Sequence, residues 1–155
     1  MESLINGVII QSLHKLVDKR GWLYEFWRYD ESLKQNAPMM GYASMTLPNV
    51  ARGPHEHVNQ TDRILFLGTS TFKVWLWDNR VSSATYGKHM VFETVNSFPM
   101  VIVIPPQVVH AYKNVGISEG IVINLPDQLF AGMNRSEPVD EIRHENNPDS
   151  QFKLV

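Results

Sequence analysis

Short apolar or alternating segments recur about every eight to twelve residues along this chain, a spacing typical of an all-β sandwich or barrel. Turn residues separate the segments. The segments predicted to be strands are Gly7–Leu13, Trp22–Arg28, Gly41–Leu47, Arg63–Leu67, Thr71–Trp77, Met90–Thr94, Val101–Ile104, Val108–Lys113 and Gly120–Leu125. They supply enough strands for two packed sheets.

The clearest alternation lies in Thr71–Asp78. One face of this strand carries Phe72, Val74 and Leu76, and we expect it to be core. The other face carries Trp75 and Trp77, which form either a binding wall or subunit interface, or a surface that packs against another element.

Helical signals are few. Asp30–Gln35 is expected to form one or two turns that an aspartate caps. The segment from Ala131 to Val155 carries many charges and few apolar anchors, so we expect it to wrap over the barrel rather than enter the core.

The composition narrows the function classes. A chain of 155 residues with 43% hydrophobic and 19% charged residues predicts one domain, residues 1–155, with a sizeable core. The net charge of -2 argues against a general nucleic-acid binder. The absence of cysteine excludes disulfides, Cys-based zinc sites, iron–sulfur clusters and thiol nucleophiles.

The chain start carries no basic segment leading into an apolar stretch, so no secretion signal is expected. The longest apolar run, Met100–Ile104, is too short to span a membrane. We therefore expect a cytoplasmic protein without a membrane partner.

Three histidines form the first candidate site. His55 and His57 are two residues apart in a segment expected to be a strand, so their side chains point to the same face. Gly53 and Pro54 place a turn or strand start directly before them. His110 opens a further predicted strand after a proline turn, and all three rings are then available to converge in a barrel.

In chain order the sequence reads His-x-His, then Gln60 or Asp62, then Gly68, then Pro-x4-His-x3-Asn ending at Asn114. This order resembles the two motifs of the cupin superfamily. The resemblance implies a cupin-type jelly-roll barrel whose mouth holds the site.

A second resemblance covers nearly the whole chain. Its motifs are Asp18–Glu25 (DKRGWLYE), Arg52–His55 (RGPH), Gly68 through Arg80, Ser82–Gly87 (SSATYG), Ile104–Pro105 and His110–Ala111. Together and in this order they resemble the dTDP-4-dehydrorhamnose 3,5-epimerase family, itself a cupin family.

The resemblance implies proton abstraction next to the ketone of a nucleotide-linked 4-keto-6-deoxy sugar, without a cofactor. His55 falls on the family's base, and imidazole suits that task because its ordinary pKa lies near 6.5. Arg63 takes the place of a lysine associated with the charged sugar oxygen, and Arg52 is a second cation nearby. The alternative for His55 is a histidine that is merely hydrogen-bonded in the barrel.

The resemblance also implies a substrate-binding set and a homodimer that exchanges N-terminal strands. Arg20 and Glu25 match positions that in the family contact the nucleotide, often across the dimer interface, although an ordinary ion pair on a strand would also explain them. His110 and Asn124 complete the expected substrate-binding set. Arg20, Arg52 and Arg63 are predicted to be concentrated at one cavity.

Two departures from the family concern its proton donor and its orienting carboxylate. The family's acid is a tyrosine, which aligns with Phe130, and a phenyl ring cannot donate a proton. The carboxylate that orients the histidine aligns with Asn147, with Asp149 two residues away as a substitute. Tyr112 or water would then reprotonate the sugar; otherwise the enzyme epimerises one carbon or isomerises the ketone.

Two further hypotheses stay open. One is a metal-dependent cupin in which His55, His57 and His110, with Gln60 or Asp62, bind Fe, Mn, Ni or Zn. The other is a catalytically degenerate protein that binds a nucleotide sugar.

Overall fold

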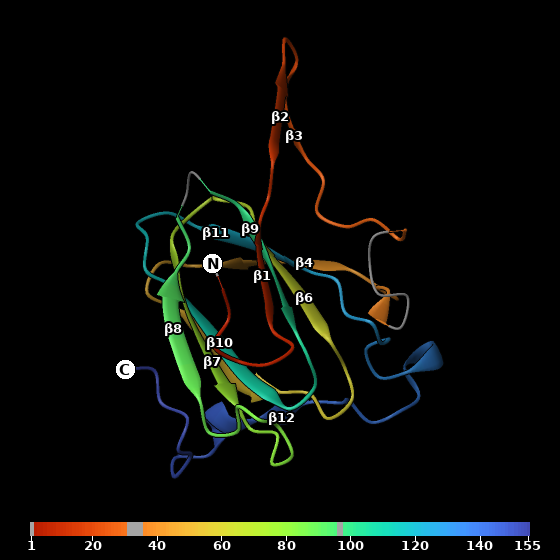
Figure 1. Cartoon of the computed structure of the whole chain (residues 1–155), viewed down its shortest axis with the longest axis vertical. Helices are drawn as coiled ribbons and strands as arrows, with labels where there is room; N and C mark the ends of the chain where they lie inside the picture. The colour runs from red at the N-terminus through yellow and green to blue at the C-terminus, as the bar shows by residue number, and fades with distance from the viewer. Residues whose placement is uncertain (1, 31–35, 96–97) are drawn as a thin grey trace.

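The computed structural model describes residues 2–30, 36–95 and 98–155. Two antiparallel five-stranded sheets make up the barrel (Figure 1). The first sheet has the order β1 (Ile9–Ser12), β9 (Met100–Ile104), β6 (Asp62–Phe66), β11 (Gly120–Asn124) and β4 (Tyr42–Thr46). The second has the order β12 (Ile142–Arg143), β5 (Ala51–Glu56), β10 (Val108–Asn114), β7 (Phe72–Asp78) and β8 (His89–Glu93).

The remaining regular structure is short. Single turns of 3-10 helix occur at η2 (Met133–Arg135) and η3 (His144–Asn146). The all-β prediction with short helical turns is confirmed, whereas the turn expected at Asp30–Gln35 falls on residues 31–35, outside the described residues. Among the described residues, no helix has the length and apolar character that a membrane crossing requires.

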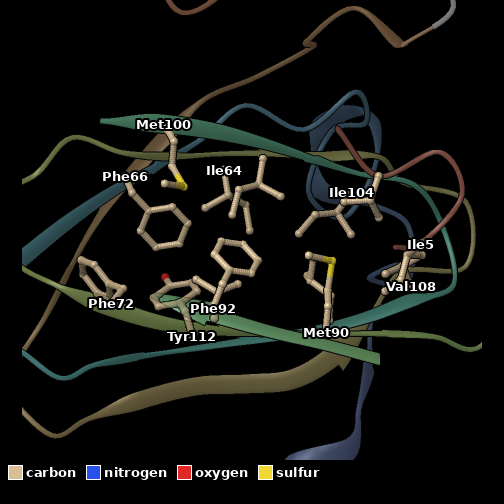
Figure 2. Close-up of a cluster of buried hydrophobic side chains, with 14 of the residues drawn as sticks. Ile5, Ile64, Phe66, Phe72, Met90, Phe92, Met100, Ile104, Val108 and Tyr112 are labelled. Atoms are coloured by element: carbon tan, nitrogen blue, oxygen red, sulfur yellow. The ribbon is translucent and has the colours of Figure 1, made fainter. Parts of the chain in front are cut away.

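The core lies between the two sheets, and Figure 2 shows its side chains interleaving from both. Ile64 and Phe66 of β6 face Phe72 and Tyr112 of the second sheet, with aromatic ring centroids 5.1 to 5.6 Å apart. The predicted core face of β7 is confirmed, because its alternate side chains are at most 2% exposed.

The opposite face of β7 packs against the C-terminal segment. Trp75 donates its indole N–H to the carbonyl oxygen of Val155 at 3.0 Å, and the Trp77 ring lies 5.7 Å from that of Phe152. Of the alternatives for this aromatic face, packing against another element is the one observed. The segment wraps over the barrel, as predicted. One of its side chains, Phe152, is nevertheless buried, with 9% of its surface exposed.

A hairpin stands out from the barrel (Figure 1). It consists of β2 (Lys15–Asp18) and β3 (Gly21–Tyr24), and β2 was not among the predicted strands. Its apolar side chains Val17 and Trp22 are 71% and 59% exposed. Because no core contact imposes an alternating pattern on β2, its sequence carries no strand signal.

The turn after β7 explains one of the sequence motifs. The buried carboxylate of Asp78 accepts hydrogen bonds from Arg80, Ser83 and Thr85. These bonds hold the pKa of Asp78 below its usual value in spite of its burial. The motif from Asp78 to Thr85 is therefore a structural turn.

Candidate active site

A cavity of about 1560 Å³ opens between the sheets at one end of the barrel. Strands β4, β5, β6, β10 and β11 contribute to its walls, and residues 126 to 145 form much of its rim. The predicted base His55, with His57 and Asp62, lines this cavity.

Strand pairing brings the three histidines together. His55 of β5 lies directly opposite His110 of β10, with ring centroids 4.4 Å apart, and His57 lies 5.8 Å from His55. Gly53 is required here: its φ is +81°, and a Cβ atom would lie 2.5 Å from the carbonyl oxygen of His110.

Asp62 joins the histidines from the facing sheet. One carboxylate oxygen, Oδ2, lies 3.2 Å from Nε2 of His57 and 3.2 Å from Nε2 of His110. The other oxygen accepts hydrogen bonds from Gln60 at 2.8 Å and from Asn124 at 3.0 Å. The Asp62 side chain is 1% exposed, so a buried carboxylate forms the floor of the site.

Backbone carbonyls fix the orientation of two of the rings. Nδ1 of His57 contacts the carbonyl oxygen of Asp140, and Nδ1 of His110 lies 3.1 Å from that of Val108. Because a carbonyl oxygen only accepts, both Nδ1 atoms carry hydrogen, and both Nε2 atoms face Asp62.

The pKa values of His55 and His57 shift in opposite directions. Burial, followed by the neighbouring His110 and His57, lowers the pKa of His55 to about 2, so its ring is neutral. Burial also lowers the pKa of His57, but the contact with Asp62 outweighs it and raises this pKa to about 9. Both histidine contacts hold the pKa of Asp62 well below its usual value, against the effect of burial. The site thus holds an ion pair, His57 with Asp62, beside a neutral imidazole.

The C-terminal segment completes the site. Glu141 places a carboxylate oxygen 4.0 Å from Nδ1 of His55. Asp140 accepts hydrogen bonds from the backbone N–H groups of residues 58, 59 and 60 at 2.8 to 2.9 Å, which holds the loop after β5. β12 pairs with β5 and fixes both acids beside the histidines.

The position predicted for the carboxylate that orients the histidine was wrong. Asn147 ends η3 and accepts a hydrogen bond from the backbone of Asp149, and neither residue is among the described residues that line the cavity. Glu141, whose carboxylate contacts His55, is better placed to orient the ring. Phe130 does line the cavity, as its alignment with the family's tyrosine implies.

Within a single chain, the prediction that three arginines gather at one cavity is wrong for two of them. Arg52 lines the cavity and donates to Thr46 and to the Met45 carbonyl at 3.1 and 3.0 Å. Arg63 follows Asp62 on β6 and therefore points to the opposite face of the sheet, where it donates to the carbonyl oxygen of Asn36 at 3.3 Å. Arg20 lies on the projecting hairpin with its side chain 84% exposed.

Arg20 and Glu25 make ordinary ion pairs within this chain. Arg20 bonds Asp18 at 2.6 Å, and Glu25 lies 3.6 Å from Arg28. Neither is among the described residues that line the cavity.

Three further predicted residues reach the cavity, whereas His110 is buried beside it, 2% exposed, and is not among the described residues that line it. Asn124 and Gln60 line it and contact Asp62, and Tyr112 lines it with its hydroxyl oxygen 3.4 Å from that of Ser44. Tyr42, which was not predicted, also lines the cavity and accepts a hydrogen bond from Asn124 at 2.9 Å.

A double-sheet antiparallel barrel that holds three histidines and a carboxylate in its mouth defines a cupin-type protein. Comparisons with known proteins narrow this class. The sequence profile of the dTDP-4-dehydrorhamnose 3,5-epimerase family matches residues 2–124. The chain belongs to this family and is a nucleotide-sugar epimerase.

Individual relatives agree with this assignment. Over 126 residues the chain is 31% identical to the probable low-salt glycan biosynthesis epimerase Agl13 of Haloferax volcanii, covering 81% of each protein. Over 113 residues it is 34% identical to the spore coat polysaccharide biosynthesis protein SpsL of Bacillus subtilis, covering 73% of this chain and 74% of SpsL. A dTDP sugar isomerase from Desulfovibrio desulfuricans shares the fold with a TM-score of 0.78 at 20% identity, covering 96% of this chain and 91% of that one.

Proposed function

We propose that the protein epimerises or isomerises a dTDP- or other nucleotide-linked 4-keto-6-deoxyhexose, with His55 as the base. The ketone acidifies the hydrogens on the neighbouring ring carbons, so the reaction needs a base and a positive group for the enolate oxygen. The observation that carries the proposal is a neutral imidazole, His55, lining a large cavity with a carboxylate 4.0 Å behind it.

The pairing of His55 with Glu141 supports the role of base. Burial lowers the pKa of His55, which leaves its ring unprotonated at neutral pH with a free nitrogen lone pair. The imidazolium that forms on abstraction then gains an anionic neighbour, because Glu141 lies at ion-pair distance from Nδ1. Of the two candidate cations for the enolate oxygen, Arg52 has the better support, since it lines the cavity and Arg63 faces the other side of its sheet.

The excess of acidic side chains in the cavity supports a dimer in which a second chain supplies positive charge. Among the described lining residues, the acids Asp62, Glu137, Asp140, Glu141 and Glu145 outnumber the bases Arg52, Arg135 and Arg143. A nucleotide diphosphate needs further positive charge, and the projecting hairpin carries exposed Lys15, Lys19 and Arg20. Insertion of this hairpin into the cavity of a second copy would supply it, in a homodimer that exchanges N-terminal strands.

This dimer has a direct test. Light scattering should give twice the mass of the chain. Arg20→Ala should weaken dTDP binding in calorimetry, whereas Arg28→Ala should not. A monomer that binds dTDP equally well without the Arg20 side chain would contradict the exchange.

Solvent exchange tests the proposed reaction. In D₂O, the wild type should place deuterium next to the ketone of a dTDP-4-keto-6-deoxyhexose. His55→Ala should slow this exchange by about 10²–10⁴-fold, the usual contribution of a general base. His89→Ala, which removes an exposed histidine on β8, is the matched control. Equal exchange by the His55 variant would overturn the role of His55.

The same cluster supports one other candidate function, that of a metal-dependent cupin. Ligand atoms of His55, His57, Asp62 and His110 lie within 4.8 Å of one another. Their nitrogen and oxygen donors suit Zn, Fe, Mn or Ni, and a bound ion would polarise a substrate oxygen. Elemental analysis of untagged protein from metal-supplemented cells decides: less than about a tenth of an equivalent per chain contradicts this alternative.

A further inference from the structure

The cavity has two walls that come from different sheets. His55 extends from β5 of the second sheet, and Tyr42 extends from β4 at the edge of the first sheet. Epimerisation removes a proton from one face of the sugar ring and adds one to the other face. If the base lies on one wall of the cavity, the proton donor must therefore lie on the opposite wall.

Two other aromatic residues of the cavity fit that task less well. Phe130 has no proton to donate. Tyr112 lies on β10, which pairs directly with the strand of His55, so it belongs to the same wall. Its ring is fixed in the core, 5.6 Å from those of Phe66 and Phe72 (Figure 2), and the residue is 7% exposed.

The hydroxyl of Tyr42 is held ready to donate. It accepts a hydrogen bond from Nδ2 of Asn124 at 2.9 Å, and the same nitrogen donates to Asp62 at 3.0 Å. The orientation of the Asn124 amide is fixed, because its oxygen accepts a hydrogen bond from the backbone N–H of Arg63 at 3.2 Å. A phenol that accepts a hydrogen bond still has its own hydrogen to give. The residue is 49% exposed, and the partial desolvation of its hydroxyl raises its pKa, so the group stays protonated at neutral pH.

The same network connects Tyr42 to the histidines. Asn124 bonds both Tyr42 and Asp62, and Asp62 contacts His57 and His110, whose ring lies 4.4 Å from that of His55. One continuous set of polar contacts therefore crosses the floor of the cavity from β4 to β5.

We infer that Tyr42 is the proton donor that stands opposite His55, in the role that Phe130 cannot fill. This inference rests on the proposed function. His55 takes the proton from the carbon next to the ketone; the electron pair of the broken C–H bond forms the C=C bond of the enolate, and the π pair of the C=O bond moves to the oxygen. As the enolate returns to the ketone, the same carbon takes the phenolic proton of Tyr42 on the opposite face. Solvent then protonates the phenolate, and His55 releases its proton to solvent.

Comparing exchange with inversion tests this role. With a dTDP-4-keto-6-deoxyhexose in D₂O, Tyr42→Phe should keep the exchange within about threefold of wild type, because His55 can return deuterium to the face it came from. Formation of the inverted sugar should fall by about 10²–10⁴-fold, the usual contribution of a general acid. A purely structural role would lower both rates together. Tyr112→Phe is the matched control and should leave the ratio of inversion to exchange unchanged.

The outcomes separate this inference from the proposed function. A wild type that shows no exchange removes the proposed function and the role of Tyr42 with it. A wild type that exchanges and inverts, together with a Tyr42→Phe variant of unchanged ratio, removes only the role of Tyr42. A changed ratio in Tyr112→Phe alone would assign the donor to Tyr112.

Discussion

Replacing Asp62 by asparagine should change how stability depends on pH. Burial lowers the pKa of His57, but its polar neighbours, Asp62 foremost, outweigh burial and raise the pKa from 6.5 to about 9; the side chain is only 11% exposed. Each pKa unit corresponds to about 1.4 kcal/mol, so these surroundings together stabilise the charged ring by about 3 kcal/mol. Because the folded-state pKa lies above the unfolded value, this stability is fully present below pH 6.5 and is lost as the pH rises through about 9.

Urea unfolding from pH 6.5 to 9.5, followed by tryptophan fluorescence, measures this effect. At pH 6.5 the Asp62→Asn variant should be about 3 kcal/mol less stable than the wild type, since its buried His57 stays neutral. The difference should shrink toward pH 9.5. Asp149→Asn, an exposed carboxylate outside the cavity, should follow the wild type at every pH. A difference between Asp62→Asn and wild type that is constant over this range would contradict the ion pair between His57 and Asp62.

Three further substitutions give independent checks. Gly53→Ala should lower the free energy of unfolding by at least about 1–3 kcal/mol, the usual cost of a strained backbone, because its Cβ would meet the His110 carbonyl; unchanged urea unfolding would contradict this. Asp78→Asn should cost about 1.5–3 kcal/mol in the same assay, since its charged hydrogen bonds are buried; a loss below about 0.5 kcal/mol would speak against the structural turn. Glu141→Gln should slow deuterium exchange about a hundredfold because the His55 imidazolium loses its anion, whereas Glu145→Gln should not; equal rates in both variants would exclude Glu141 from this role.

The sequence predicted the barrel well because its strands bury one face. Along β7 the apolar side chains alternate with the pleat, and this pattern gives both the strand and its core face. The hairpin strand Lys15–Asp18 escaped prediction for the opposite reason: all its residues are exposed, so no burial pattern marks it.

The histidines of the site were predictable, but their surroundings were only partly so. His55 and His57 share a face by spacing, and pairing of β5 with β10 adds His110. Arg63 was expected in the cavity from the resemblance alone, but neighbouring residues on a strand point to opposite faces, and this alternation directs its side chain away from the cavity. Asp62, one residue earlier, occupies the interior instead.

Glu141 and Tyr42 carry no local signal at all. Glu141 lies in a charged segment whose path depends on the two-residue strand β12 and on contacts with distant residues, among them the Trp77–Phe152 ring pair. Tyr42 reads as an ordinary strand aromatic, and only the bond to Asn124 across the β4–β11 pair distinguishes it. Such long-range contacts cannot be read from spacing along the chain.

The role of His55 as the base is tested most directly by a proton NMR spectrum of a dTDP-4-keto-6-deoxyhexose in D₂O with the wild type and with His55→Ala. If His55 is the base, the signals of the hydrogens next to the ketone, at C3, C5 or both, disappear with the wild type and persist with the variant. Signals that persist with the wild type, or that vanish equally fast with His55→Ala, would contradict it.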